Sequence, residues 1–265
     1  GGLTRDPANP LDDVYIEKIP TFSHEALSDL EPLTLEYCDA ALQGTAEEMK
    51  GKHFFAKIDE GVLVGLLDGH GSCDVANFVA KEFKARFSSK LKEAEGNVKQ
   101  AFEEVFKEIQ IEVEKYDEWK NMGSTAVISF IDKTTHLIYT ATLGDSEANI
   151  YRKRDEKLQS IPLSCVRDWS CKKEAARAAT ALGNPSIAVT WTKAKNPKWL
   201  RYSDLNISRS IGYRHAKTHK KVLGFPQALG SSTTSPKADF VETPLSKEII
   251  PPISCKPKVT VNLLE

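Results

Sequence analysis

The chain has 265 residues and a net charge of −1, with 40% hydrophobic and 28% charged residues. This balance is typical of a globular protein and disfavours a general binder of nucleic acid or of a membrane surface, because each needs a basic face. No apolar run approaches the roughly 18 residues that cross a bilayer, and no signal-peptide layout is present, so we expect an intracellular protein, cytoplasmic or nuclear. The five cysteines form no CxxC pair, which favours reduced thiols over a disulfide framework.

Residues 1–32 are polar and contain four prolines, which predicts an extended N-terminal arm before a domain over residues 33–265. The first strands are expected at Phe54–Ala56 and Gly61–Leu67, the second a continuous apolar run of the kind that is buried on both faces. Ser72 is a candidate cap of the helix that follows. Its apolar stripe consists of Val75, Phe78, Val79, Phe83 and Phe87.

A second amphipathic helix presents one apolar face, made of Ala101, Phe102, Val105, Phe106 and Ile109. A meander of strands is expected next, at Ser124–Ile131, His136–Leu143 and Glu147–Arg152. An alanine-rich helix is expected over Lys172–Leu182, and the proline-rich residues 226–258 predict an extended crossing or a surface loop. Strands, two helices and then a meander predict an α+β architecture of sheets with helices packed outside.

The sharpest candidate site is Asp68-Gly69-His70-Gly71, at the end of the expected buried strand. A carboxylate followed by glycine places a hard oxygen ligand beside an accessible carbonyl, an arrangement that suits Mg²⁺ or Mn²⁺. His70 is a candidate proton donor to a leaving group. Taken alone, the four residues fit a tight turn around the aspartate better than a metal site.

Other motifs along the chain favour the metal site over the tight turn. Gly123–Ala126 opens one strand, Leu143–Ser146 closes the next, and Ile207–Gly212 lies further on. Weaker matches occur at Tyr37–Asp39, Gln43-Gly44, Leu163-Ser164, Glu174, Arg177 and Pro257–Val261. In order and spacing, these motifs resemble the metal-dependent protein phosphatase family, type 2C, over about residues 33–265.

The resemblance implies a four-layer α-β-β-α sandwich, in which two packed and mainly antiparallel sheets are flanked by helices. It also implies a centre of two Mg²⁺ or Mn²⁺ ions that activates a water for attack on phosphoserine or phosphothreonine. By the same resemblance, Asp68 matches a bridging carboxylate, Gly69 a carbonyl ligand and His70 a general acid. Asp145 matches a ligand of the family's weaker third metal.

Several positions depart from the family's motifs. The phosphate-binding arginine falls on Ala46, and the acidic pair of the metal site falls on Lys50-Gly51, so that only a bulge would bring Glu47 or Glu48 into place. Two further pairs differ, with Gly212-Tyr213 in place of Gly-Asp and Val166-Arg167 in place of Asp-His. The motifs that carry the family's last two metal aspartates have no counterpart after Pro257–Val261.

Two hypotheses follow. The first is a monomeric, catalytically impaired phosphatase, a pseudophosphatase, that binds a protein or a phosphorylated partner. The second is an active Mg²⁺- or Mn²⁺-dependent serine/threonine phosphatase of which this chain is a part. The internal substitutions at Ala46, Lys50-Gly51 and Tyr213 favour the first hypothesis, because truncation does not explain them.

Two basic stretches leave alternatives open. Trp191–Trp199 lies where the family places a flap beside the active site, and its three lysines either grip an acidic or phosphorylated partner or are simply solvated. Arg214–Lys221 is either an anion site or, as is usual for such runs, a solvated surface.

Overall fold

The computed structural model describes residues 33–196, 200–218 and 252–264. The N-terminal arm expected over residues 1–32 and most of the proline-rich segment 226–258 lie outside the described residues. Within the described part of the chain, no helix combines the length and the apolar character needed to cross a membrane.

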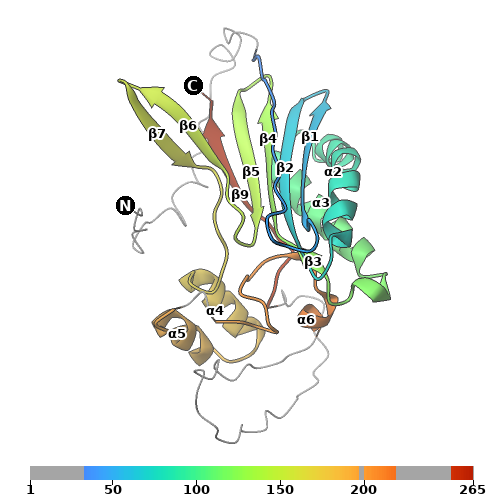
Figure 1. The fold of residues 1–265 in the computed structure, drawn as a ribbon, viewed down its shortest axis with the longest axis vertical. Coiled ribbons are helices and arrows are strands. Elements are labelled where there is room, and N and C mark those ends of the chain that lie inside the picture. Colours follow the sequence, from blue (N-terminus) through green and yellow to red (C-terminus); the bar gives the residue numbers. More distant parts are fainter. Residues whose placement is uncertain (1–32, 197–199, 219–251, 265) are drawn as a thin grey trace, which may run out of the picture.

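The body of the molecule is a seven-stranded sheet in which every strand pair is antiparallel (Figure 1). Six strands follow the order β8-β3-β2-β4-β5-β9, and β1 also pairs with β2. The strands are β1 (Gly51–Ile58), β2 (Gly61–His70), β3 (Gly123–Ser124), β4 (Ala126–Asp132), β5 (Leu137–Leu143), β8 (Ile211–Gly212) and β9 (Lys258–Leu263). The strands expected from residues 54–67, 124–131 and 136–143 are therefore confirmed.

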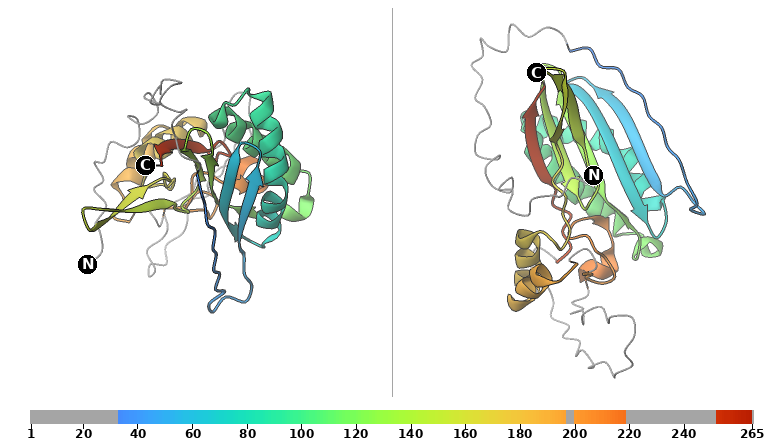
Figure 2. Two further views of the ribbon diagram at one scale, coloured as in Figure 1. Left: turned by 90° about the horizontal axis from the view of Figure 1, so that it is seen from above. Right: turned by 60° about the vertical axis from the view of Figure 1, so that its left-hand side comes forward.

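Two long helices, α2 (Asp74–Glu93) and α3 (Val98–Val113), cover one face of this sheet (Figure 2). The apolar residues of each helix recur every three or four positions and so form a single stripe toward the sheet. Phenylalanine rings interlock there, with 5.3 Å between the ring centroids of Phe83 and Phe106 and 5.2 Å between those of Phe87 and Phe130. Ser72 lies one residue before the N-cap position, and its hydroxyl accepts the amide N–H of Asp74 at 3.1 Å.

A hairpin of β6 (Asn149–Arg154) and β7 (Lys157–Pro162) forms a separate two-stranded sheet. Its turn places Asp155 and Glu156 in the left-handed region without a glycine, and its strands are mostly exposed. Because β7 is polar and lacks an apolar run, the sequence did not predict it. The predicted α+β class with mainly antiparallel sheets is confirmed, and this hairpin is the second sheet among the described residues.

The remaining helices are α4 (Lys172–Ala181), α5 (Ser186–Lys193), α6 (Arg214–Thr218) and the short 3₁₀ turn η1 (Asp117–Trp119). Around α4 and α5 lies a second apolar cluster, distinct from the core between α2, α3 and the sheet. Trp169, Trp191 and Tyr202 are at its centre, with 4.7 Å between the two indole centroids. The helix α4 was predicted, whereas α5 was not, and only its last three residues fall within the stretch Trp191–Trp199 interpreted as a flap.

Candidate functional site

The motif Asp68-Gly69-His70 forms the last residues of β2, where the strand leaves its pairing with β4 and pairs with β3 instead. The side chains of Asp68 and His70 are 56% and 46% exposed. The ring of His70 lies beside Asp68, with its Nδ1 3.1 Å from the Asp68 carbonyl oxygen and its Nε2 3.8 Å from the Asp68 carboxylate. The structure therefore places both predicted catalytic side chains together, in contact with solvent.

Thr125 links this strand end to the turn that carries Asp145. Its amide N–H donates to the Asp68 carbonyl at 3.0 Å, and its hydroxyl lies 2.6 Å from that of Ser146. Gly144 has a φ of +89°, and a Cβ there would come within 2.8 Å of the Thr125 side chain. Only glycine therefore allows the turn to approach so closely, which explains the Gly-Asp sequence at this position.

Tyr213 lies at the centre of this group. Its side chain packs across Gly123, where an added Cβ would come within 2.3 Å of the ring. Its hydroxyl is buried and has no hydrogen-bond partner among the described residues. Burial, followed by the charges of Asp68 and Asp145, raises the pKa of this phenol well above its usual value. The sequence marked Tyr213 only as a departure from a motif, whereas the structure buries it against Gly123, where the charges of both predicted carboxylate ligands affect its pKa.

The positions at which the sequence placed the missing ligands supply none. Gly51 lies directly opposite Asp68 in the β1–β2 ladder and contributes no side chain, while the Lys50 carbonyl accepts the amide N–H of Gly69. Glu48 turns toward the start of α2, where it accepts a hydrogen bond from the Cys73 thiol at 3.0 Å. Residues 33–50, which include the weaker matches at Tyr37–Asp39 and Gln43-Gly44, form neither helix nor strand.

A pair of divalent cations needs several anionic ligands to offset the repulsion between the metals. Among the described residues, no group of three or more His, Cys, Asp or Glu side chains lies close enough to hold a metal ion. The Tyr213 phenol, whose pKa is raised by burial and by the charges of Asp68 and Asp145, supplies neither charge nor a deprotonated oxygen at neutral pH. The donors of the described residues therefore do not fit a two-metal centre.

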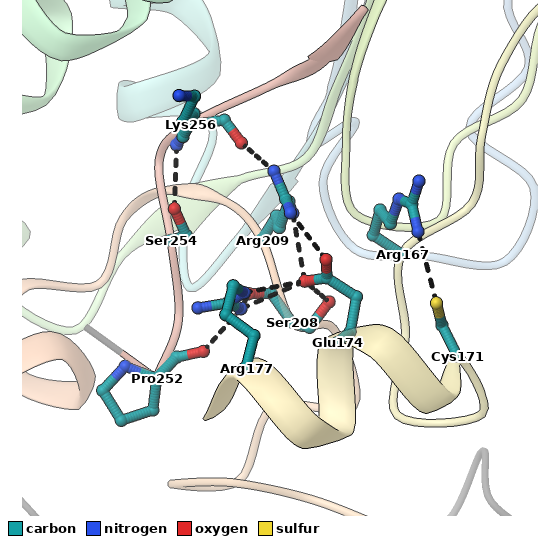
Figure 3. Close-up of polar contacts among 9 residues, drawn as sticks. All are labelled: Arg167, Cys171, Glu174, Arg177, Ser208, Arg209, Pro252, Ser254 and Lys256. Carbon is teal, nitrogen blue, oxygen red and sulfur yellow. Dashed lines mark hydrogen bonds and ion pairs between the residues drawn. The ribbon is translucent and has the colours of Figure 1, made fainter. Parts of the chain in front are cut away.

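Glu174 and Arg177, two of the weaker motif matches, lie on α4 and form a buried ionic network (Figure 3). The Glu174 carboxylate accepts from Arg209 at 2.6 Å and 3.0 Å, from Arg177 at 3.0 Å and from the Ser208 hydroxyl at 2.9 Å. Burial alone would raise the pKa of Glu174, but the hydrogen bond and charge of Arg209, with those of neighbouring arginines, lower it to about 2. Glu174 is therefore ionised at any physiological pH.

The same network joins three distant parts of the chain. Arg177 donates to the backbone carbonyls of Ser208 and Pro252, and Arg209 donates to that of Lys256. It thus connects α4 to the residues that lead into β8 and into β9. The sequence pointed to Arg209 through the motif Ile207–Gly212, but only the fold reveals that this arginine binds Glu174.

A buried lysine supports the segment that carries Tyr213. Lys217 Nζ donates to Gln110 Oε1 at 2.7 Å and to the Ser210 carbonyl at 2.8 Å. Gln110 also binds the backbone N–H and carbonyl of Gly212, next to Tyr213. Burial lowers the pKa of Lys217 to about 8, against smaller opposing effects of Cys255 and Glu114. The sequence missed both residues, because an isolated glutamine and a lysine within a basic run carry no signal of burial.

Comparison with known proteins gives a consistent result. The family model described as protein phosphatase 2C matches residues 36–261. A curated rice (Oryza sativa subsp. japonica) protein, "Probable protein phosphatase 2C 6", is 29% identical over 173 residues, which is 58% of this chain and 34% of that protein.

Two solved structures share the fold. One, described as a C. elegans sex determining protein, has a TM-score of 0.58 at 18% identity, over 84% of this chain and 47% of the other. The other, a serine-threonine phosphatase 2C from Toxoplasma gondii, has a TM-score of 0.54 at 12% identity, over 84% and 71%. This chain thus spans only about a third of the rice protein and about half of the first of these structures.

Proposed function

This chain belongs to the protein phosphatase 2C family, and we propose that it is a catalytically impaired member, a pseudophosphatase, that acts by binding a protein partner. The observation that supports this proposal is the environment of Asp68. Across the ladder from Asp68 stands a glycine, and the phenol of Tyr213, whose pKa the charges of Asp68 and Asp145 help to raise, is neutral. Neither residue offers the anionic oxygen that a divalent cation requires.

Asp68, the Gly69 carbonyl and Asp145 remain the predicted oxygen ligands, and His70 the predicted general acid. In a family member with a complete centre, the metals would supply the activated water and would offset the charge on the phosphoryl oxygens. What the described residues of this chain themselves offer is narrower: Asp68 and His70 at the end of β2, and Asp145 in the turn after β5. These groups can orient a partner's hydrogen-bond donors or cations.

The test is the release of phosphate from phosphoserine and phosphothreonine peptides in millimolar Mn²⁺ or Mg²⁺. The full chain is compared with its Asp68→Asn variant, and circular dichroism establishes that both are folded. We expect no release above the enzyme-free blank from either protein. Release that the substitution abolishes would contradict the proposal and support the alternative, an active metal-dependent serine/threonine phosphatase whose remaining ligands lie outside the described residues.

A further inference from the structure

Residues 163–218 differ sharply in charge from the part of the chain that precedes them. They carry eleven lysines and arginines against three acidic residues, whereas residues 33–162 carry 17 basic and 23 acidic residues. In the structure, the described residues of 163–218 include α4, α5, α6 and β8, and α4 and α5 pack against each other at one end of the sheet (Figure 1). We call these described residues the basic lobe.

Two of the three acidic side chains of residues 163–218 are buried within the basic lobe. Glu174 is buried between Arg177 and Arg209, so its charge does not reach the surface. Asp168 is also buried, and its carboxylate accepts hydrogen bonds from the amide and the hydroxyl of Ser170. Asp204 is thus the one exposed carboxylate among the described residues of the lobe, and the surface of the lobe is left strongly positive.

Several exposed cations are close in sequence to the aromatic residues of the second apolar cluster. Lys172 begins α4 three residues after Trp169, Lys193 ends α5 two residues after Trp191, and Arg201 adjoins Tyr202. Trp169 contacts both other rings, with centroid distances of 4.7 Å to Trp191 and 6.4 Å to Tyr202. Because these rings pack together, the backbone positions of Lys172, Lys193 and Arg201 lie near one apolar cluster, and Lys195 follows two residues after Lys193.

We propose that the basic lobe is the docking surface for an acidic protein segment rich in aspartate and glutamate. Lysine ammonium groups are separate point charges on flexible stems, so they suit carboxylates that are spread along a peptide. A single phosphate is best bound by a convergent arginine fork. Arg177 and Arg209 do not form such a fork, because their guanidinium groups are bound to Glu174 and to backbone carbonyls.

The charge of the rest of the chain limits the length of such a ligand. A long polyanion such as nucleic acid would extend from the lobe over residues 33–162, where acidic residues outnumber basic ones. A short acidic segment instead stays within reach of the exposed lysines.

The inference rests on the proposed binding role and names the chemistry of the partner. The test measures the binding of a fluorescent, glutamate-rich peptide of about ten residues to the full chain by anisotropy, at about 50 mM and about 300 mM salt. The triple variant Lys172→Glu/Lys193→Glu/Lys195→Glu reverses charges of the lobe. A matched control, Lys81→Glu/Lys84→Glu/Lys99→Glu, reverses three exposed lysines on α2 and α3.

We expect the lobe variant to bind the peptide at least about tenfold more weakly at low salt, and the control to stay within about twofold of the parent chain. High salt should remove most of the difference. Equal losses in both variants would overturn the proposal, as would equally tight binding of a glutamine-substituted peptide, of a neutral peptide with one phosphoserine, or of single-stranded DNA of similar length. Since no hydrolysis is measured, these outcomes are distinct from a failure of the proposed function.

Discussion

Gly51 of β1 lies directly opposite Asp68 of β2, so the neighbouring strand presents no side chain at the position closest to this carboxylate. Residues paired in this way project their side chains from the same face, with Cβ atoms about 5 Å apart. A Cβ at Gly51 would meet nothing closer than the Leu67 carbonyl oxygen at 3.7 Å, an ordinary contact. The backbone thus has room for a second carboxylate beside Asp68, and only the side chain is missing.

Gly51→Asp is therefore expected to create a binding site for Mn²⁺ that the parent chain lacks. Without metal, the added charge beside Asp68 should lower stability slightly, because like charges repel across a ladder. With Mn²⁺ at about a hundred times its dissociation constant, binding should stabilise the variant by about 2.7 kcal/mol. Thermal unfolding with and without Mn²⁺, together with titration calorimetry, measures both effects.

The matched control is Gly51→Asn, which has the same size and no charge. It should show neither the loss of stability from like charges nor a response to Mn²⁺. If the asparagine and aspartate variants respond to Mn²⁺ alike, the carboxylate is not the missing element of this site.

Glu174→Gln should be among the most damaging single substitutions in the chain. Glu174 is 3% exposed and binds two arginine side chains that are themselves 18% and 13% exposed. The substitution leaves their charges without the carboxylate, a loss that typically costs about 3–5 kcal/mol in buried pairs. Urea unfolding should reveal the change in the free energy of unfolding, with little change in m-value.

The surface pair of Arg86 and Glu82 supplies the comparison. Glu82→Gln removes an ion pair of 3.3 Å within α2, on side chains that are 26% and 32% exposed, and should cost less than about 1 kcal/mol. Similar costs for both glutamines would mean that the Glu174 network does not hold α4 to the segments before β8 and β9.

Much of the fold could be predicted because its signals are local. The stripe of phenylalanines on α2 repeats every three or four residues, and the strand run from Gly61 to Leu67 is continuous and apolar, so both elements follow from periodicity alone. The strand β7 did not follow, because an exposed hairpin with a glycine-free turn carries no apolar pattern. The helix α5 is short, and its contacts with α4 and with Trp169 stabilise it.

The candidate site was predictable only in part, for a physical reason. Asp68 and His70 form one motif, so the sequence alone placed them together. The position of Tyr213 against Gly123 depends on the pairing of β8 with β3, a contact between segments about 90 residues apart. The same holds for Lys217 and Gln110, because their hydrogen bond joins residues that are 107 positions apart. Local sequence patterns do not predict such a contact.

The buried Lys217 should make stability depend on alkaline pH. Its pKa is about 8 in the folded chain and near 10.5 when unfolded, so the unfolded state binds more protons between these values and stability rises with pH there. Below pH 8 both states hold the proton, and the cost of burying the charge is present in full. The rise should amount to roughly 3 kcal/mol and should be absent in Lys217→Met. If the stability of Lys217→Met rises by the same amount as that of the parent chain between pH 8 and 10.5, Lys217 is not the titrating group.

Tyr213→Phe should stabilise the chain, which is unusual for a change at a buried aromatic residue. The phenol hydroxyl is buried with no hydrogen-bond partner among the described residues, so folding removes it from water without compensation. Phenylalanine keeps the ring against Gly123 and removes that cost, a gain of about 1 kcal/mol in the free energy of unfolding. Tyr151→Phe is the control, since Tyr151 is 63% exposed and its hydroxyl stays hydrated in both states. A loss of stability in Tyr213→Phe, with none in the control, would mean that the Tyr213 hydroxyl donates a hydrogen bond to an acceptor. Tyr213 would then contribute a polar group to the site and would not merely occupy space in it.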